Sequence, residues 1–303
     1  MNYETCQFRL GSLMCTVICD GNYTYAPPVF PPPANFIFSL APKDQLDAEF
    51  KRHILKNEER NRWISSFNCL LIDSGDHQVL IDTGGAGFGP DTGRLLKNLV
   101  SAGASPYSIR YVILTHGHPD HIGGCSDQHG SPTFPNAHYF MSSNEWDFWR
   151  SGQAGNEIRE YHRDVMLKTE FDNLPAIRNQ IVKVDEETDI LPGIRIIPAY
   201  RHTPGHIAVL ISSKDRKLLF VSDAFFHPLQ VEYPEWAGIA DLDPAMTVLT
   251  RRKLLELAVK ENALVLGFHF PFPGLGWIIK NRERYAWLTY LTQLHHSVWE
   301  LKQ

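Results

Sequence analysis

Metal-binding side chains are concentrated in the stretch THGHPDHIGG, residues 115–124. It places three histidines and one aspartate within six consecutive positions, after the apolar run RYVIL and shortly before two glycines. Only 14 of the 303 residues are histidine, so this combination would arise by chance at about 0.002 per chain of this length. Open α/β sheets gather their ligands at the carboxyl ends of strands, where this loop is expected. The pattern therefore predicts a metal-binding loop rather than a solvated polar turn.

The spacing within this loop suits two metal ions better than one. His116 and His118 are two positions apart, which lets both imidazoles point at one position in a tight turn. Asp120 and His121 face a second position nearby, as in two-metal sites. Four ligands do not complete two coordination spheres. Further histidine and aspartate residues are therefore expected at the ends of other strands.

Three such residues follow later in the chain. His206 comes after the turn TPG in HTPGH, Asp223 ends the apolar stretch KLLFVSD, and His269 ends ALVLGFH. A strand-end histidine alone is usually structural or exposed, but these residues all share the context of an apolar strand followed by a turn. The carboxylate of Asp223 is also suited to bridging two cations. His202 and His227 lie close to these residues and are left open between supporting the site, contacting a substrate and a plain core or surface role.

Aromatic side chains are expected to form an apolar pocket above the metals. Phe270 and Phe272 are the best candidates because they follow a predicted ligand, His269. Such a pocket suits an acyl chain or an aryl ester better than a charged nucleotide. The other candidates are Tyr23, Tyr25, Phe30, Phe36, Phe38, Trp146, Trp149 and Phe226.

The elements that must position these residues form two β-rich stretches, each with a helix. Apolar strands precede an amphipathic helix in both halves, which suggests two packed sheets covered by helices. Asp241 or Asp243 is expected to cap the start of the second helix. The strands are expected at 67–73, 78–84, 110–116 and 137–141 in the first half and at 193–200, 207–213, 217–223 and 263–269 in the second, with helices at 92–103 and 243–262.

Two segments differ from these modules. Residues 144–180 have the pattern of polar-faced helices and form a predicted insertion beside the core. Residues 23–38 contain five prolines and several aromatics, so an ordered extended arm is expected there, lying on an apolar surface. That surface belongs either to a second copy of the chain in a homodimer or to the same chain. Residues 1–303 are expected to form one domain, with 1–60 as an N-terminal arm and helix.

Composition limits the partners. The net charge is -5 and no long cluster of Lys and Arg occurs, which argues against nucleic acid. Neither a secretory signal nor an apolar run of about 18 residues is visible, so a cytoplasmic protein without a membrane partner is expected. The five cysteines lie in apolar segments and predict buried thiols rather than disulfides. A small-molecule substrate is therefore expected.

Several motifs together resemble those of a known family. HGHPDH, TPGH, SDAFFH and GFHFPFPGLG, in this order and spacing, resemble the metallo-β-lactamase superfamily of dinuclear hydrolases over about residues 60–285. The segments DTG, GRLLKNL, EWDFW and PFPGLG further resemble the branch that contains methyl parathion hydrolase and the N-acyl homoserine lactone lactonases. The resemblance implies a four-layer αββα sandwich, an α/β fold, with two metal ions at one edge.

The resemblance also implies a role for each predicted ligand. Asp82 in IDTG matches a family position that supports the histidine loop without binding metal. Ligands made only of nitrogen and oxygen suit zinc first, with manganese, cobalt or iron as alternatives. The implied ligands are His116, His118 and His206 for the first metal and Asp120, His121 and His269 for the second, with Asp223 bridging the two.

The expected enzyme is a metal-dependent hydrolase of a lactone or carboxylic ester with an apolar moiety, with side activity on organophosphate triesters. A hydroxide shared by two metals would attack the carbonyl, and Asp120 would pass a proton to the leaving alkoxide. The alternatives are a thioesterase similar to glyoxalase II, a di-iron redox protein and a metal-binding protein without catalysis. Di-iron relatives typically carry Glu where His118 stands, which argues against the redox alternative. A metal-binding protein without catalysis would be expected to have lost a ligand, and none is lost here.

Overall fold

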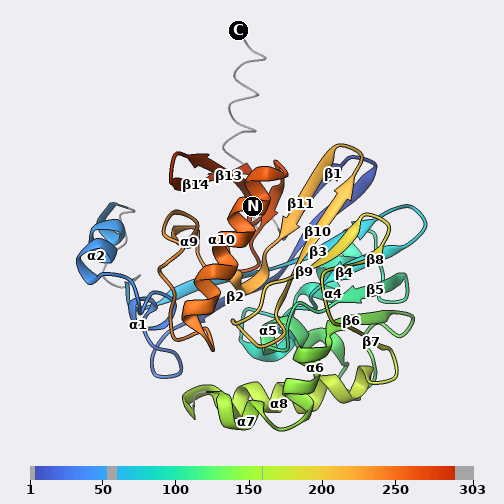
Figure 1. The fold of residues 1–303 in the computed structure, drawn as a ribbon. Coiled ribbons are helices and arrows are strands. Elements are labelled where there is room, and N and C mark those ends of the chain that lie inside the picture. Colours follow the sequence, from blue (N-terminus) through green and yellow to red (C-terminus); the bar gives the residue numbers. More distant parts are fainter. Residues whose placement is uncertain (1–3, 53–59, 159, 291–303) are drawn as a thin grey trace.

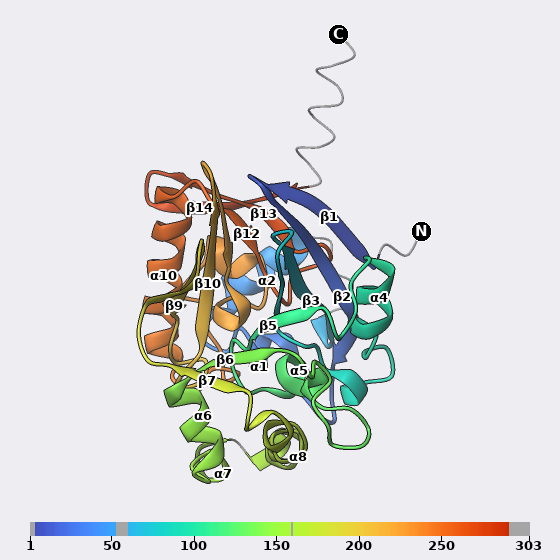
Figure 2. The ribbon, with the colours of Figure 1, turned by 90° about the vertical axis from the view of Figure 1, so that its right-hand side faces the viewer.

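Two seven-stranded sheets face each other in the computed structural model, which describes residues 4–52, 60–158 and 160–290. Helix α4 (Leu95–Ser101) lies outside the first sheet and helix α10 (Pro244–Lys260) outside the second (Figure 2). The layers run helix, sheet, sheet, helix, which confirms the predicted αββα sandwich. Both ends of the expected single domain lie outside the described residues.

The first sheet follows the chain order from β1 to β7. Strands β1 to β4 pair antiparallel, and β4 to β7 pair parallel. Strands β3 and β4 form a hairpin, in which Asp73 pairs with Gln78. The strands are β1 (Thr5–Leu10), β2 (Leu13–Tyr25), β3 (Trp63–Asp73), β4 (Gln78–Ile81), β5 (Ile109–Ile113), β6 (His138–Ser142) and β7 (Ile181–Val184).

The second sheet runs in the order β14, β13, β12, β11, β10, β9, β8. All its neighbours pair antiparallel except β11 and β12. Successive side chains of a strand point to opposite faces, so Val209 of β10 joins the core between the sheets while Leu210 joins the core beside α10. The strands are β8 (Thr188–Leu191), β9 (Ile194–Pro198), β10 (Ile207–Ser213), β11 (Arg216–Phe220), β12 (Leu264–Leu266), β13 (Leu275–Asn281) and β14 (Arg284–Thr289).

Strands β11 and β12 end before the predicted ligands that were expected to close them, so each of these ligands lies in a turn. Strand β11 stops at Phe220, and Ser222, with a φ of 45°, begins the short 3-10 segment η3 (Ser222–Ala224) that carries Asp223. Strand β12 stops at Leu266, three residues before His269. The ligands therefore sit in turns beyond the strand ends, where the backbone aims a side chain across the edge of the sheet.

The helices cover the sheets and connect their strands. Helix α10 begins after Asp243, whose carboxylate accepts a hydrogen bond of 3.1 Å from the Met246 N–H, so the capping residue is Asp243 rather than Asp241. Helix α4 is shorter than the expected 92–103 because Gly93, with a φ of 86°, precedes it. The remaining helical segments are α1 (Pro33–Phe36), α2 (Lys43–Arg52), η1 (Ala86–Phe88), α5 (Pro119–Ile122), η2 (Gly123–Cys125), α6 (Ser143–Arg150), α7 (Ala154–Glu157), α8 (Glu160–Ile177) and α9 (Leu229–Glu232).

The N-terminal segment differs from the expected extended arm. Strand β2 continues through Tyr25, which pairs with Trp63, after a bulge between Cys19 and Asn22. A turn and helix α1 follow, and the rings of Phe30, Phe36 and Phe38 are buried. The segment therefore folds back onto an apolar surface of its own chain. The homodimer stays a prediction.

The expected helices of residues 144–180 are confirmed as α6, α7 and α8. They lie below strands β6 and β7 in Figure 1 and form the crossover between these two parallel strands. Parallel neighbours require such a long connection. The segment is therefore part of the first sheet's connectivity as well as a cover beside the core.

The five cysteines all lie in the described ranges and are free thiols that form no disulfides with one another. Cys15, Cys19, Cys69 and Cys125 are buried free thiols, and Cys6 is half-buried. Burial raises the pKa of Cys15 to about 12, which keeps this thiol protonated at neutral pH. Across the described ranges, none of the helices combines the length and the apolar character needed to cross a membrane.

Candidate metal centre

The histidine loop follows β5 and is fastened at several points. The Ile207 N–H donates to the Thr115 carbonyl at 3.0 Å, which joins the loop to the start of β10. The Thr83 N–H donates to the His121 carbonyl at 2.8 Å, which joins it to the segment after β4. Pro119 occupies the first turn of α5, so His118 precedes the helix in an extended conformation. The loop is thus held between the two sheets.

One group of donor atoms gathers around His118. The donor atoms of this first group all lie within 4.8 Å of one another. His118 Nδ1 is 2.9 Å from both His116 Nε2 and His202 Nε2. Such convergence of imidazole nitrogens and a carboxylate on one position is the arrangement a divalent cation requires. The members of the first group are His116, His118, His202 and Asp223.

A second group consists of Asp120, His121 and His269, with donor atoms again within 4.8 Å of one another. Asp120 Oδ2 lies 3.4 Å from His269 Nε2 and 3.7 Å from His121 Nε2. The Nε2 of His121 is buried and has no hydrogen-bond partner within the described part of the chain. A buried ring nitrogen aimed into a cluster of donors fits a bound cation.

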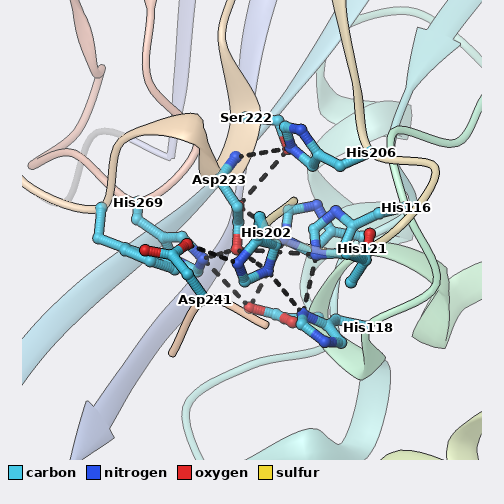
Figure 3. A network of polar contacts seen from close by, with 12 residues as sticks. His116, His118, His121, His202, His206, Ser222, Asp223, Asp241 and His269 are labelled. Carbon is cyan, nitrogen blue, oxygen red and sulfur yellow. Dashed lines mark hydrogen bonds and ion pairs between the residues drawn. The ribbon is translucent and has the colours of Figure 1, made fainter. Parts of the chain in front are cut away.

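Asp223 links the two groups. Its Oδ2 lies 3.5 Å from His202 Nε2 and 3.0 Å from His269 Nε2, and its Oδ1 lies 3.1 Å from His121 Nε2 (Figure 3). Burial would raise the pKa of Asp223, but His269, His121 and His116 hold it well below its usual value. The carboxylate is therefore ionised and within reach of both groups, as a bridging ligand must be.

The structure corrects the expected role of His206. Its Nδ1 is 2.8 Å from the Ala199 carbonyl, and its Nε2 accepts a hydrogen bond of 3.2 Å from the Asp223 N–H. Both ring nitrogens are thereby engaged with backbone, and burial lowers the pKa of His206 to about 3, so the ring is neutral. In Figure 3, His206 lies on the side of Asp223 away from His118. His202, which the sequence left open, joins the first group instead.

A carboxylate and a guanidinium hold His202 in place. Asp241 Oδ1 lies 3.2 Å from His202 Nδ1, and Asp241 Oδ2 lies 3.4 Å from Arg251 Nη2. Arg251 is fully buried and also donates to the Ala224 carbonyl at 2.6 Å. Asp241 therefore orients His202, a member of the first donor group, instead of capping α10. Its contact with Nδ1 leaves Nε2 of His202 free to face the cluster.

Glu145 of α6 fastens the two loops that carry the first group. Its carboxylate accepts hydrogen bonds from Gly117 N at 2.9 Å, Thr203 Oγ1 at 2.7 Å and Gly205 N at 2.9 Å. Trp149, one turn later in α6, donates through Nε1 at 2.7 Å. Burial raises the pKa of Glu145, although all four hydrogen bonds oppose that shift. The only indication of Glu145 in the sequence is its place in the segment EWDFW, which did not predict that it would hold the two loops.

Residue 117 must be glycine for this arrangement. A Cβ atom at Gly117 would lie 2.2 Å from Trp149 Nε1, which is far inside contact distance. The backbone of the histidine loop can therefore approach Glu145 and Trp149 only without a side chain at this position. The glycine between the first two histidines is part of how the first group is held.

The second group is supported by residues of the first sheet. Asp82, directly after β4, accepts from Thr115 N at 2.8 Å and lies 2.8 Å from His121 Nδ1 through Oδ2. Its position matches the supporting role that the family resemblance implies. Ser65 of β3 places its Oγ 2.7 Å from His269 Nδ1. Both contacts engage Nδ1 and leave Nε2 of the ligand directed at the cluster.

The pKa values of two neighbouring histidines, His116 and His121, shift in opposite directions, although their ring centroids are only 4.0 Å apart. Burial together with the neighbouring His121 lowers the pKa of His116 well below its usual value, with Asp223 opposing. Burial also acts to lower the pKa of His121, but the carboxylates of Asp223, Asp120 and Asp82 outweigh it and raise that pKa well above its usual value. Negative charge therefore predominates around the second group, where it favours a cation.

A small aromatic cavity of about 30 Å³ lies over the cluster. Of the predicted pocket residues, Tyr25, Phe30, Phe36 and Phe226 line it. Sequence reasoning missed four further lining residues, which come from distant elements and carry no local signal: Trp63, Phe88, Met166 and Ala240.

The other predicted pocket residues lie elsewhere. Phe270, a leading candidate, packs against Trp287 at 5.0 Å in the core beside α10, so this prediction is wrong. His227 accepts a hydrogen bond of 3.1 Å from the Leu229 N–H and faces Phe38 at 5.7 Å. The remaining candidates pack outside the set that lines the cavity: Tyr23, Phe38, Trp146, Trp149 and Phe272.

The family is decided by comparison with known proteins. The model of the metallo-beta-lactamase superfamily matches residues 66–269, which include both groups of donors. The chain belongs to the metallo-beta-lactamase superfamily. It is a metal-dependent hydrolase, as its named relatives in this superfamily are.

Relatives within the superfamily include enzymes with assigned substrates. The chain is 23% identical over 243 residues to an N-acyl homoserine lactonase of Bacillus sp, covering 76% of this chain and 85% of that one. It is 26% identical over 187 residues to a probable metallo-hydrolase of Mycobacterium tuberculosis, covering 53% and 57% of the two chains.

Solved structures of superfamily members match nearly the whole chain. The dizinc quorum-quenching lactonase AidC, in complex with the product N-hexanoyl-L-homoserine, has a TM-score of 0.83 at 27% identity and covers 94% of this chain and 97% of its own. The hydrolase AbOPH has a TM-score of 0.83 at 27% identity and covers 95% and 98%. The covered shares extend beyond residues 66–269, which the superfamily model matches.

Proposed function

We propose that this protein hydrolyses a lactone or a carboxylic ester with an apolar acyl or aryl group. The observation that supports this most is the pair of donor groups linked by Asp223 beneath a cavity lined by aromatic rings. Two divalent cations held there would acidify a water molecule and polarise the carbonyl oxygen of a substrate. Zinc suits donors of this kind, with manganese, cobalt or iron as alternatives.

The proposed ligands follow from the geometry of the cluster. They are His116, His118 and His202 for the first cation and Asp120, His121 and His269 for the second, with Asp223 shared. Because these residues come from both halves of the sandwich, we also propose that the chain works as one domain. A small molecule is the proposed partner, in line with the lactonase relatives and their product complexes.

The chain's own residues have distinct tasks in this reaction. Asp120 reaches the cavity and is placed to carry a proton to the leaving oxygen. The rings of Trp63 and Phe226 cover the cluster and exclude water from it. Apart from the metal ligands, the described residues that line the cavity carry no charge, which favours a neutral acyl or aryl group over an ionic one.

Metal analysis combined with a substrate panel tests the proposal. The purified protein should contain two zinc ions per chain and hydrolyse N-acyl homoserine lactones or nitrophenyl esters, with organophosphate triesters as weaker substrates. His118→Ala should abolish this activity. His129→Ala is the matched control because His129 is exposed and lies outside both groups.

Different outcomes separate the alternatives. Fewer than one metal per chain, or hydrolysis that survives His118→Ala, would defeat the proposal. Preference for thioesters over lactones would identify the thioesterase alternative. An iron spectrum, or bound metal without turnover of any acyl substrate, would favour the redox or non-catalytic alternatives.

A further inference from the structure

Tyr25 is the last residue of β2 and reaches the metal centre from the N-terminal segment. The strand bulges between Cys19 and Asn22 and then resumes pairing with β3, so that Tyr25 is paired with Trp63. Both residues line the cavity over the cluster. Among the described residues that line this cavity, Tyr25 alone carries a hydroxyl group.

The hydroxyl contacts an atom of the second group directly. Tyr25 Oη donates to Asp120 Oδ2 over 3.2 Å. Asp120 Oδ2 also lies 3.4 Å from His269 Nε2 and 3.7 Å from His121 Nε2. Tyr25 therefore touches the carboxylate oxygen that faces the ligands of the second group.

Aromatic neighbours fix the direction of this hydrogen bond. The Tyr25 ring stacks on Trp63 at 4.6 Å and meets Phe30 edge-on at 4.8 Å and Tyr23 edge-on at 4.7 Å. The residue is 6% exposed. A ring enclosed on several sides cannot turn its hydroxyl to solvent, so the donor stays aimed at Asp120.

We propose that Tyr25 is a positioning residue that holds the Asp120 carboxyl for proton transfer to the leaving oxygen. This rests on the proposed hydrolysis of an ester or lactone. The attacking water leaves its oxygen on the acyl carbon, and Asp120 takes up one of its protons. When the acyl C–O bond breaks, that proton passes from Asp120 to the leaving oxygen, which becomes an alcohol, and Tyr25 keeps its own proton throughout.

The variant Tyr25→Phe tests this with two classes of substrate. It removes one hydroxyl and retains the ring packing. For a lactone or alkyl ester, whose alkoxide needs a proton to leave, kcat should fall about 10-fold to 100-fold, a part of what general acid catalysis supplies. For a nitrophenyl ester, whose phenolate leaves without a proton, kcat should change less than about 3-fold. Metal content should remain at the wild-type value.

Tyr139→Phe is the matched control. Tyr139 is also buried, and its hydroxyl accepts a hydrogen bond of 3.3 Å from the Phe134 N–H, outside both donor groups. Its removal should leave the ratio of lactone to nitrophenyl ester turnover at the wild-type value. Thermal melting of both variants shows that each is folded.

Three results would overturn the inference. Unchanged lactone turnover would show that the Tyr25 hydroxyl is not needed. Equal losses of kcat for both substrate classes would indicate that this hydroxyl acts on the carbonyl oxygen of the substrate instead. Loss of bound metal would make it a support of the ligands alone. A wild-type protein inactive on all acyl substrates would count against the proposed function itself, whereas an active wild type with an unaffected Tyr25→Phe variant would count against this inference only.

Discussion

The two donor groups share Asp223 but are held by different parts of the molecule. The first group depends on loops: Glu145 of α6 fastens the turns that carry His118 and His202, and Asp241 orients His202 from the segment before α10. The second group depends on the first sheet. Its supports come from the strand β3 at Ser65 and from the end of β4, where Asp82 lies.

Different parts of the chain therefore position the two donor groups. Residues on strands hold a ligand more exactly than residues on loops. His118 is also partly exposed, whereas Asp120, His121 and His269 are buried. The first position should therefore be the one that exchanges its metal, and a chelator should empty it before the second.

Asp223→Ala should weaken metal binding in both groups, because each loses its shared ligand. We expect less than one metal per chain and a fall in kcat/KM of more than about 100-fold, the upper end of what loss of a supporting residue costs. Plasma mass spectrometry and lactone kinetics measure the two effects. Asp215→Ala, at an exposed turn, is the control. Retention of one firmly bound metal would contradict the shared role.

His202→Ala and His206→Ala should separate a ligand from a supporting residue. Loss of the His202 ring should leave about one metal per chain and lower kcat/KM about 100-fold, whereas loss of His206 should retain the metals and cost about 10-fold. Metal content of the two purified variants decides the matter. The reverse order would restore the assignment made from the sequence.

Glu145→Gln and Asp82→Asn should weaken different positions. Each keeps the size of the side chain but removes charge and one acceptor, so metal affinity should fall about 10-fold to 100-fold at the supported group. Chelator titration should show the first step shifted for Glu145→Gln and the second for Asp82→Asn. Identical shifts in both variants would mean that the groups are not supported separately.

Labelling of the cysteines should leave both groups intact. Burial raises the pKa of Cys125 to about 12 and that of Cys19 to about 11, so the thiolate fraction at pH 8 is about one in a thousand or less. These thiols have lower pKa values in the unfolded chain than in the folded one. The free energy of unfolding therefore falls as the pH rises above 9.0, the ordinary pKa of a cysteine thiol. At pH 8 we expect an aromatic disulfide reagent to label at most Cys6, without loss of activity. Rapid labelling of several thiols would contradict this.

The histidine loop and the layered fold could be predicted because their signals are local. Apolar runs followed by turns predicted strands β3 to β6 and β9 to β12 but not the outer strands of either sheet. The segment THGHPDH carries its predicted ligands within one loop. The sequence led to His206 rather than His202, although both flank the same TPG turn. In the structure the Ala199 carbonyl and the Asp223 N–H engage both ring nitrogens of His206, which favours His202.

The cavity was harder to predict for a related reason. Phe270 follows a ligand in sequence, yet the turn after β12 directs it into the core beside α10. Trp63 and Met166 reach the cavity from β3 and from α8, far apart in the chain. Adjacency in sequence says little about which side of a turn a ring will face, and long-range packing decides it.

The origin of the donors in both halves of the sandwich has a consequence for biosynthesis. His116 is made more than 150 residues before His269, and Asp223 lies between them. Contacts so distant in sequence form late in folding, because the chain between them must first be ordered. The second group cannot be complete until the turn after β12, which carries His269, has emerged from the ribosome and docked. Uptake of a second cation would therefore require a chain extended beyond His269, and a chain truncated before this residue would lack the second group.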